Sequence, residues 1–383
     1  MKNIRLKLFL ENNVFPLFSA INSWKKHDSK KILFYINSDF RENNKVLFDY
    51  MVANRYNNRY KITVSCRDYA KYKKEKINNV RYVGFWRAIW EFLTSYYVFY
   101  SVGRIPIIPA KDQLVMQMWH GVPLKEADKG LIELGKVKRQ YYTWVLSPSE
   151  FLKPIFSRWL TVPEESIYIG GYPRCDYLFN MEKKYDFGNY KKLLLWTPTF
   201  RVSEFLGYTD VDMHGNIVPI LNDKMFVQMN EFLKKKRAKI IVKLHPAQDL
   251  SNYSLMELDH FILLSHDEFK KKGYDLYTLA SQADALITDY SSIYFDYMLT
   301  DRPIGFTVDD FEEYKSNRGF SLPPEKFMPG SKIKNYEDLL NFVQDVVDDK
   351  DPYKEERHEV NKLINQDPTG GYCQKILDFV GIK

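Results

Sequence analysis

Short apolar runs alternate with longer amphipathic stretches from Lys31 onward. Residues 31–39, 61–68 and 113–121 each begin with an apolar run that stops at polar residues, as buried strands do. Residues 45–56 have the spacing of an amphipathic helix instead. Apolar runs separated by helices are typical of a parallel sheet that is covered on both faces. The pattern therefore predicts an α/β fold.

The second half of the chain repeats this theme. Strand-like runs begin near residues 192, 239, 260 and 284, and helix-like stretches cover residues 222–238 and 275–283. A strand and a Gly-Pro turn close the first half, which predicts a boundary between Gly171 and Asp176. We therefore expect two α/β domains of similar size, residues 30–175 and residues 176–383, the second with closing helices.

The segment that precedes these domains, residues 1–29, is amphipathic. Apolar residues recur near helical spacing from Leu6 to Trp24, and lysines and arginines flank them. This arrangement suits a helix that lies in a membrane interface. Docking of the same helix on its own domain explains the pattern equally well, because Pro16 interrupts it and such stripes usually pack into a core.

Polar clusters follow five of the predicted strands. Ligands of open parallel sheets bind beyond the carboxyl ends of the strands, so these clusters are candidate site residues. Ser291 and Ser292 stand where a helix begins, so their hydroxyls and the free amides there suit a phosphate, although a serine at that place is often only a helix cap. The clusters are residues 119–125 (WHGVPLK), 171–174 (GYPR), 197–201 (TPTFR), 243–246 (KLHP) and 288–292 (TDYSS).

Two histidines occupy these clusters, one in each predicted domain. His120 precedes Gly121 and a turn, and His245 repeats the arrangement in the second domain. A single histidine after a buried strand is more often a hydrogen-bonded core residue than a catalyst, but two at strand ends can converge on one ligand. Five basic residues accompany the clusters and are candidate counter-charges for a phosphate, with surface charge as the alternative: Lys125, Arg174, Arg201, Lys243 and Arg302.

Composition narrows the class of protein. The 383 residues carry 45% apolar and 27% charged residues, which are values of a globular protein. The charge of +7 favours anionic partners without choosing among nucleotides, lipid head groups and nucleic acid. No stretch is apolar enough to span a bilayer, and no cleavable signal is visible. Three scattered cysteines without zinc spacing predict a reducing compartment and no structural metal.

Several known nucleotide motifs are missing from the sequence. It contains no GxGxxG and no GxxxxGK[ST], and no paired-carboxylate metal motif follows a strand. Dehydrogenase and P-loop chemistry are therefore not supported. A basic membrane-binding or nucleic-acid-binding protein would account for the charge and the many aromatic residues, but not for polar clusters gathered at strand ends.

These clusters, in their order, resemble the CDP-glycerol:glycerophosphate glycerophosphotransferase family of teichoic-acid and capsule synthesis. The resemblance covers roughly residues 114–320, and its most specific part is "LITDYSSIYFDYMLTDRPIGF". It implies a glycosyltransferase-B-like fold, with two Rossmann-like domains that face a cleft and a CDP-alditol bound mainly by the second. It also implies a peripheral enzyme on the cytoplasmic face of the cell membrane.

The resemblance implies that glycerol phosphate passes from CDP-glycerol to an undecaprenyl-pyrophosphate-linked saccharide, with release of CMP and no cofactor. The essential histidines of the family fall on His120, our candidate base, and on His245. We expect a contact with anionic membrane and none with nucleic acid. A CDP-ribitol donor and a nucleotide-sugar glycosyltransferase remain open alternatives. The expected substrate-binding residues are Ser291, Ser292, Asp289, Thr199, Arg201, Lys243, Arg302, Lys125 and Arg174.

Overall fold

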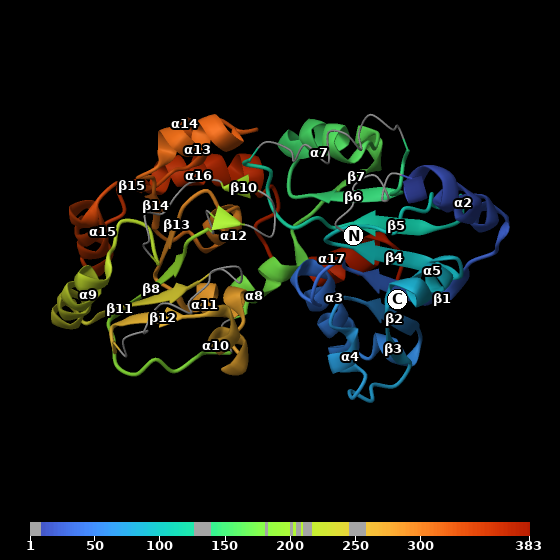
Figure 1. The fold of residues 1–383 in the computed structure, drawn as a ribbon, viewed down its shortest axis with the longest axis horizontal. Coiled ribbons are helices and arrows are strands. Elements are labelled where there is room, and N and C mark those ends of the chain that lie inside the picture. The colour runs from blue at the N-terminus through green and yellow to red at the C-terminus, as the bar shows by residue number, and fades with distance from the viewer. Residues whose placement is uncertain are drawn as a thin grey trace. The chain divides into compact units, whose positions relative to one another are not determined.

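The protein consists of two compact α/β units in a computed structural model. Each unit is described here by itself (Figure 1). Unit 1 comprises Met1–His120, Asp128–Asp176 and Gln366–Lys383, and unit 2 comprises Gly121–Ala127 and Tyr177–Asn365. The structure describes residues 9–125, 139–180, 183–199, 202–203, 208–209, 217–244 and 258–383.

Unit 1 is built on a parallel sheet of seven strands in the order β3-β2-β1-β4-β5-β6-β7. Its central strands are buried on both faces, which explains their continuous apolar runs: Ile32, Phe34, Val98 and Phe99 have no exposed surface. The strands are β1 (Asp28–Tyr35), β2 (Lys61–Ser65), β3 (Val80–Val83), β4 (Ser95–Tyr100), β5 (Leu114–Gln117), β6 (Trp144–Ser147) and β7 (Ile167–Ile169).

Helices cover both faces of this sheet. In Figure 1, α3 and α17 lie on one side of the strands and α5 on the other. The helices are η1 (Leu10–Val14), α2 (Phe15–Trp24), α3 (Glu42–Ala53), η2 (Tyr56–Asn58), α4 (Tyr69–Tyr72), α5 (Phe85–Phe92), η3 (Glu150–Leu152), α7 (Lys153–Leu160), η4 (Glu164–Ser166), η5 (Pro173–Cys175), α8 (Asp176–Phe179) and α17 (Tyr372–Phe379).

Unit 2 contains a second parallel sheet, with six strands in the order β12-β11-β8-β13-β14-β15. The strand order reverses between β8 and β13, as in a Rossmann fold, and ligands of such sheets bind beyond the carboxyl ends at that point. The strands are β8 (Lys192–Thr197), β11 (Ala238–Lys243), β12 (Phe261–Leu264), β13 (Ala285–Thr288), β14 (Ile304–Thr307) and β15 (Ser331–Ile333); β9 (Val202–Ser203) and β10 (Tyr208–Thr209) pair separately.

The core of unit 2 lies between this sheet and two helices. Met229 and Leu233 of α9 and Val343 of α15 pack with Trp196 and Ile240 of the sheet, and none of the five has exposed surface. Figure 1 shows α10, α11 and α12 on the opposite face. The helices are α9 (Asp223–Lys236), α10 (His266–Lys271), α11 (Leu276–Gln282), α12 (Ile293–Tyr297), η6 (Met298–Thr300), α13 (Phe311–Arg318), α14 (Pro324–Phe327), α15 (Tyr336–Val347) and α16 (Lys354–Ile364). The predicted pair of α/β units with parallel sheets is thus confirmed.

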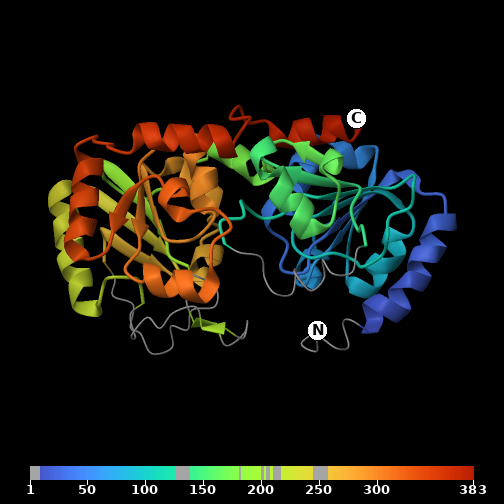
Figure 2. The ribbon, with the colours of Figure 1, turned by 90° about the horizontal axis from the view of Figure 1, so that it is seen from above.

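The last helix differs from the expected division, because α17 belongs to unit 1 and not to unit 2. The carboxylate of Asp176 accepts hydrogen bonds from the backbone N–H groups of Tyr372 and Cys373, at 2.7 and 2.9 Å, and so caps the helix. Gly171 lies so close to the Tyr372 ring that an added Cβ would stand 2.2 Å from it. Figure 2 shows α17, the red helix at the C-terminus, beside blue segments from the beginning of the chain. Contacts between residues about 200 positions apart decided this assignment.

The helix α2 is docked on unit 1 through a buried asparagine. Asn22 has no exposed surface and donates to the carbonyl of Ile108 and to the side chain of Gln113, at 3.1 and 2.7 Å. His27 contacts the Asn22 amide oxygen at 3.0 Å. The outward face of the same helix carries Trp24, which is 91% exposed. The helix therefore packs on its own unit and still presents apolar side chains to solvent.

A buried arginine is expected to hold α16 in unit 2. The Arg357 side chain is 1% exposed and donates to both carboxylate oxygens of Asp351, at 3.0 and 2.5 Å. Removing one partner of a buried ion pair leaves the other charge uncompensated, so we expect Arg357→Ala to lower the free energy of unfolding by about 3 to 5 kcal/mol. Lys354→Ala removes an exposed partner of Asp301 and should cost less than about 1 kcal/mol. Equal losses for both variants in chemical denaturation would contradict this assignment.

Candidate functional site

Asp289, in the TDYSS cluster, forms a hydrogen bond across the point where the strand order of unit 2 reverses. Asp289 follows β13 and has no exposed surface. Its carboxylate accepts a hydrogen bond of 2.7 Å from the backbone N–H of Thr199, which follows β8. One residue earlier, Thr288 donates its hydroxyl to the Thr197 carbonyl at 2.9 Å. Asp289 and Thr199 thus fix the carboxyl ends of two neighbouring strands at the place where ligands of such sheets bind.

Ser291 and Ser292 lie directly after this junction and are half-buried. Ser292 occupies the N-cap position of α12, but its side chain makes no capping hydrogen bond. The simple helix-cap explanation of this serine therefore lacks the bond that defines it. The preceding residue, Tyr290, is stacked on Tyr314 with ring centroids 4.0 Å apart, and its hydroxyl donates to Asp310 at 2.9 Å. The residue before the two serines is therefore held in place by a ring contact and a hydrogen bond.

Unit 1 positions His120 through the beginning of α3. His120 follows β5, and Asn43 donates to the carbonyls of the two residues before it, Met118 at 3.3 Å and Trp119 at 2.9 Å. Asn43 has no exposed surface. Trp119 has a φ of 56°, in the left-handed region that non-glycine residues adopt only when their surroundings hold them there. The backbone that carries His120 is therefore fixed by side-chain hydrogen bonds.

Arg174 completes this arrangement and is itself buried. Its guanidinium donates to the His120 carbonyl at 2.9 Å and to the carboxylate of Glu42, the first residue of α3, at 2.7 Å. Its backbone N–H donates to the Asn43 side chain at 3.2 Å. We predicted that Arg174 contacts a substrate. In the structure its hydrogen bonds to the His120 carbonyl and to Glu42 hold the peptide that carries His120, which makes it a positioning residue.

The electrostatic surroundings keep His120 neutral at physiological pH. The side chain is solvent-exposed, but the protein around the ring desolvates it and lowers its pKa to about 4. The Glu42 carboxylate opposes this shift, whereas the positive charge of Arg174 adds to it. Burial raises the pKa of Glu42, but the charges of Arg174 and Arg41, the Arg174 hydrogen bond and the neighbouring His120 together lower it below its usual value, so Glu42 stays ionised. A neutral imidazole next to an ionised carboxylate can accept a proton.

The remaining predicted residues are distributed as follows. Lys243 ends β11, and its ammonium lies 5.8 Å from the Phe269 ring centroid. Lys125 pairs with Phe320 through a β-bridge in unit 2, and its ammonium lies 5.3 Å from the Tyr314 ring centroid. Both lie near the carboxyl edge of the second sheet. Arg201 and His245 lie outside the residues that the structure describes.

Arg302 lies at the opposite edge of that sheet, so its predicted place is wrong. It precedes β14, and its guanidinium donates to the carbonyls of Ser281 and Ala283 at 2.7 and 2.6 Å, where α11 ends. A cation at the carboxyl end of a helix satisfies carbonyls that have no partner within the helix. Sequence order alone misplaced Arg302, because the chain returns through α12 and η6 to the amino edge before β14 begins.

Two residues of the site, Glu42 and Asn43, were missed in the sequence, and a third, Asp310, reads there as a solvated loop residue. Glu42 and Asn43 belong to a polar run after β1, and Asp310 follows β14. The same strand-end reasoning that selected TDYSS applies to both places, since β1 and β14 also end at carboxyl edges. The run "RENNK" has the composition of a solvated helix start, so the sequence does not indicate that Asn43 and Asn44 are fully buried.

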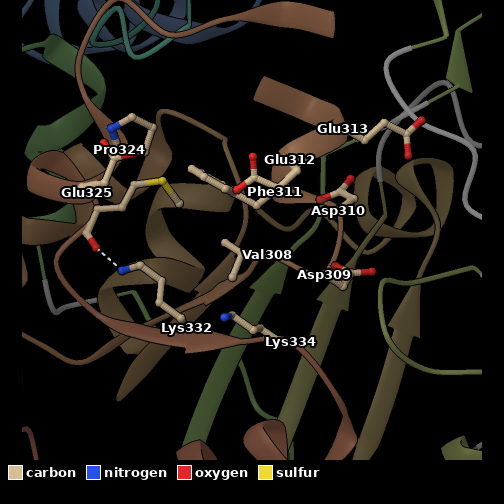
Figure 3. Close-up of a pocket in the computed structure, with 11 residues that line it drawn as sticks. Val308, Asp309, Asp310, Phe311, Glu312, Glu313, Pro324, Glu325, Lys332 and Lys334 are labelled. Carbon is tan, nitrogen blue, oxygen red and sulfur yellow. Dashed lines mark hydrogen bonds between the residues drawn. The ribbon is translucent and has the colours of Figure 1, made fainter. Parts of the chain in front are cut away.

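A cavity opens at the carboxyl ends of β14 and β15 (Figure 3). Its volume is about 610 Å³. Residues 308–313 form one wall, and Pro324, Glu325, Met328, Lys332 and Lys334 line the rest. Among the described residues, no group of three or more His, Cys, Asp or Glu side chains is arranged to hold a metal ion. Within the same described ranges, no helix is long and apolar enough to cross a bilayer.

Known proteins resemble the chain along nearly its whole length. A family model described as CDP-glycerol:poly(glycerophosphate) glycerophosphotransferase matches residues 17–381. A teichoic acid ribitol-phosphate primase of Bacillus spizizenii is 29% identical over 295 residues, which are 70% of this chain and 70% of that protein. A teichoic acid poly(glycerol phosphate) polymerase of the same species is 26% identical over 361 residues, 86% of this chain and 87% of that protein.

A solved structure of a variant of the wall teichoic acid polymerase TagF has the same fold. Its TM-score is 0.72 at 21% identity, and the match covers 98% of this chain and 94% of that chain. At this identity the likeness concerns the fold alone. It agrees with the two-unit, glycosyltransferase-B-like class that the sequence predicted.

The contacts of His120 predict how its titration responds to Glu42. A carboxylate favours the charged imidazolium, so Glu42→Gln should lower the pKa of His120 further below its usual range. NMR titration of labelled histidine measures this shift. Glu150→Gln, which changes an exposed carboxylate paired with Lys153 in the same unit, is the control and should leave the pKa of His120 unchanged. An unchanged or raised pKa in Glu42→Gln would show that the carboxylate does not act on this ring.

Proposed function

The chain belongs to the CDP-glycerol:poly(glycerophosphate) glycerophosphotransferase family, and on that basis we propose that it transfers glycerol phosphate from CDP-glycerol to a hydroxyl of a lipid-linked acceptor. The proposed acceptor is a saccharide on undecaprenyl pyrophosphate, the released product is CMP, and the polymer is of the teichoic-acid or capsule type. The observation that carries the proposal is the TDYSS junction, where Ser291 and Ser292 follow the Asp289–Thr199 bond at the strand-order reversal.

The proposed reaction is a phosphoryl transfer. The acceptor oxygen forms a bond to the β-phosphorus of CDP-glycerol, the bond from that phosphorus to the CMP oxygen breaks, and CMP leaves with the electron pair. The hydroxyl proton passes to His120, which is neutral because desolvation lowers its pKa to about 4. Such chemistry requires chiefly positioning and charge stabilisation.

The donor diphosphate is assigned to unit 2. Hydroxyls of Ser291 and Ser292 suit an anion at the start of α12, and Lys243 and Lys125 supply positive charge near the same edge. Arg201 and His245 keep their sequence-based roles as further phosphate contacts. No metal or cofactor takes part in this proposal.

CDP-ribitol is the alternative donor. The relative that is 29% identical is a ribitol-phosphate primase, whereas the one that is 26% identical is a glycerol-phosphate polymerase. Residues that hold the CMP-phosphate part do not distinguish the two donors, because both carry it. The choice therefore depends on the contacts of the alditol itself.

The anionic surface of a membrane is the proposed partner of unit 1. Leu17, Ile21 and Trp24 on the outward face of α2 are 66%, 47% and 91% exposed, and Lys25 and Lys26 follow them. Trp86 and Trp90 of α5 are also exposed, four residues apart on one helix. Exposed apolar side chains beside lysines are typical of a protein that lies on a membrane interface. This proposal places the enzyme on the cytoplasmic face, where nucleotide-activated donors are available.

A donor assay tests the proposed activity. We expect CMP release in the presence of a lipid-linked acceptor from CDP-glycerol or CDP-ribitol, and no nucleoside diphosphate release from nucleotide sugars. His120→Ala should lower turnover by about 10² to 10⁴, the usual loss of a general base. His358→Ala, which changes an exposed histidine paired with Asp301, is the control and should retain turnover. Near-normal turnover of a folded His120→Ala protein would exclude this residue as the base.

Vesicle binding tests the membrane proposal. The triple variant Leu17→Ser/Ile21→Ser/Trp24→Ser removes apolar side chains that are exposed in the folded protein, so unit 1 should stay folded. We expect its affinity for anionic vesicles to fall at least tenfold, since a few buried apolar side chains account for more than that factor. Val227→Ser on α9 is the control, because that side chain is 45% exposed in unit 2. Undiminished cosedimentation of the triple variant would assign the contact to another surface.

A further inference from the structure

The cavity of unit 2 adjoins the proposed diphosphate position. Asp310 lines the cavity and accepts a hydrogen bond of 2.9 Å from Tyr290, the residue directly before Ser291. One hydrogen bond therefore links the cavity lining to the residue next to the serines. The volume of about 610 Å³ lies in the range of about 300 to 1,000 Å³ that is usual for ligand pockets.

Carboxylates outnumber positive charges in its lining. Asp309, Asp310, Glu312, Glu313 and Glu325 supply five carboxylates, and Lys332 and Lys334 supply two ammonium groups. Figure 3 shows these side chains on both walls of the cavity. Carboxylates repel a phosphate, but they accept hydrogen bonds from hydroxyl groups and form the stronger, charge-assisted kind. The lining therefore suits a neutral molecule with several hydroxyls and disfavours an anion.

One of the two lysines is already occupied by backbone. Lys332 donates to the carbonyls of Met328 and Gly330 at 2.5 and 3.0 Å. Desolvation lowers the pKa of Lys332 to about 8, against the opposing charge of Glu356. Because the Lys332 ammonium already donates to two backbone carbonyls, it attracts an anion less than a lysine without such bonds would. Val308, Phe311 and Met328 add apolar surface to the cavity.

We infer that this cavity is the subsite for the alditol end of the donor, and that its carboxylates, with Glu312 and Glu325 on opposite walls, hold the alditol hydroxyls. This inference rests on the proposed function, because the donor phosphates must lie at Ser291 and Ser292 for the alditol to reach the cavity. Ribitol offers two more hydroxyls than glycerol, so the carboxylate lining is where the two donors are distinguished.

Binding measurements with three ligands test the subsite. The ligands are CDP-glycerol, CDP-ribitol and CDP, which has the diphosphate but no alditol, and calorimetry gives each dissociation constant. Glu312→Ala/Glu325→Ala should weaken the binding of the donor that the parent protein prefers by about tenfold, the equivalent of one hydrogen bond to a charged group. Its affinity for CDP should stay equal or rise, because two negative charges have been removed. Glu337→Ala/Glu355→Ala, which changes two exposed carboxylates outside the cavity, should bind all three ligands as the parent does.

A serine variant separates failure of the inference from failure of the proposed function. Ser291→Ala/Ser292→Ala should weaken binding of all three ligands, because each carries the diphosphate. If the parent protein bound none of them, the proposed function would fail. If the serine variant behaved as expected but Glu312→Ala/Glu325→Ala bound CDP-alditol like the parent, or lost CDP equally, the proposed donor site would stand and the alditol subsite would be overturned.

Discussion

Hydrogen bonds from side chains to the carboxyl ends of two parallel sheets hold both candidate sites. Beyond the last residues of parallel strands, the backbone N–H and C=O groups no longer pair with a neighbouring strand. Where these groups are buried, they require other hydrogen-bond partners. In unit 2, the side chains of Asp289 and Thr288 supply them across the strand-order reversal. In unit 1, Asn43 and Arg174 supply them to residues 118–120.

The two edges have different electrostatic characters. The His120 edge combines an exposed imidazole with an ion pair between the buried Arg174 and the half-buried Glu42, so a neutral imidazole lies beside two fixed charges. The Ser291 edge joins a place suited to phosphate to a cavity rich in carboxylates. One donor molecule has the same polarity, with an anionic diphosphate and a neutral polyhydroxyl end. On the proposed function, the second edge is therefore complementary to the whole donor and not only to its diphosphate.

Much of this architecture follows from local patterns in the sequence, and the errors have a common cause. Strands such as β11 and β13 were recognisable because burial on both faces forces continuous apolar runs. TDYSS was recognisable because polar residues interrupt such a run. Arg302 was misplaced because its edge depends on the path of α12 and η6, and Asn43 was missed because its partners are about 75 residues away. Patterns within ten residues reveal elements, whereas the partners of a side chain are set by the tertiary fold.

The attachment of α17 to unit 1 has a consequence for biosynthesis. Unit 1 begins with the first strand of the chain but receives α17 only from residues 366–383, which are translated after all of unit 2. Domains usually fold as the nascent chain leaves the ribosome, the earlier one first. Here unit 1 lacks α17, which packs on α3, until unit 2 has been translated. The Asp176 carboxylate lacks its hydrogen bonds from Tyr372 and Cys373 during the same period. The surface of unit 1 that α17 covers in the folded protein is therefore exposed in the nascent chain until residues 366–383 have been translated.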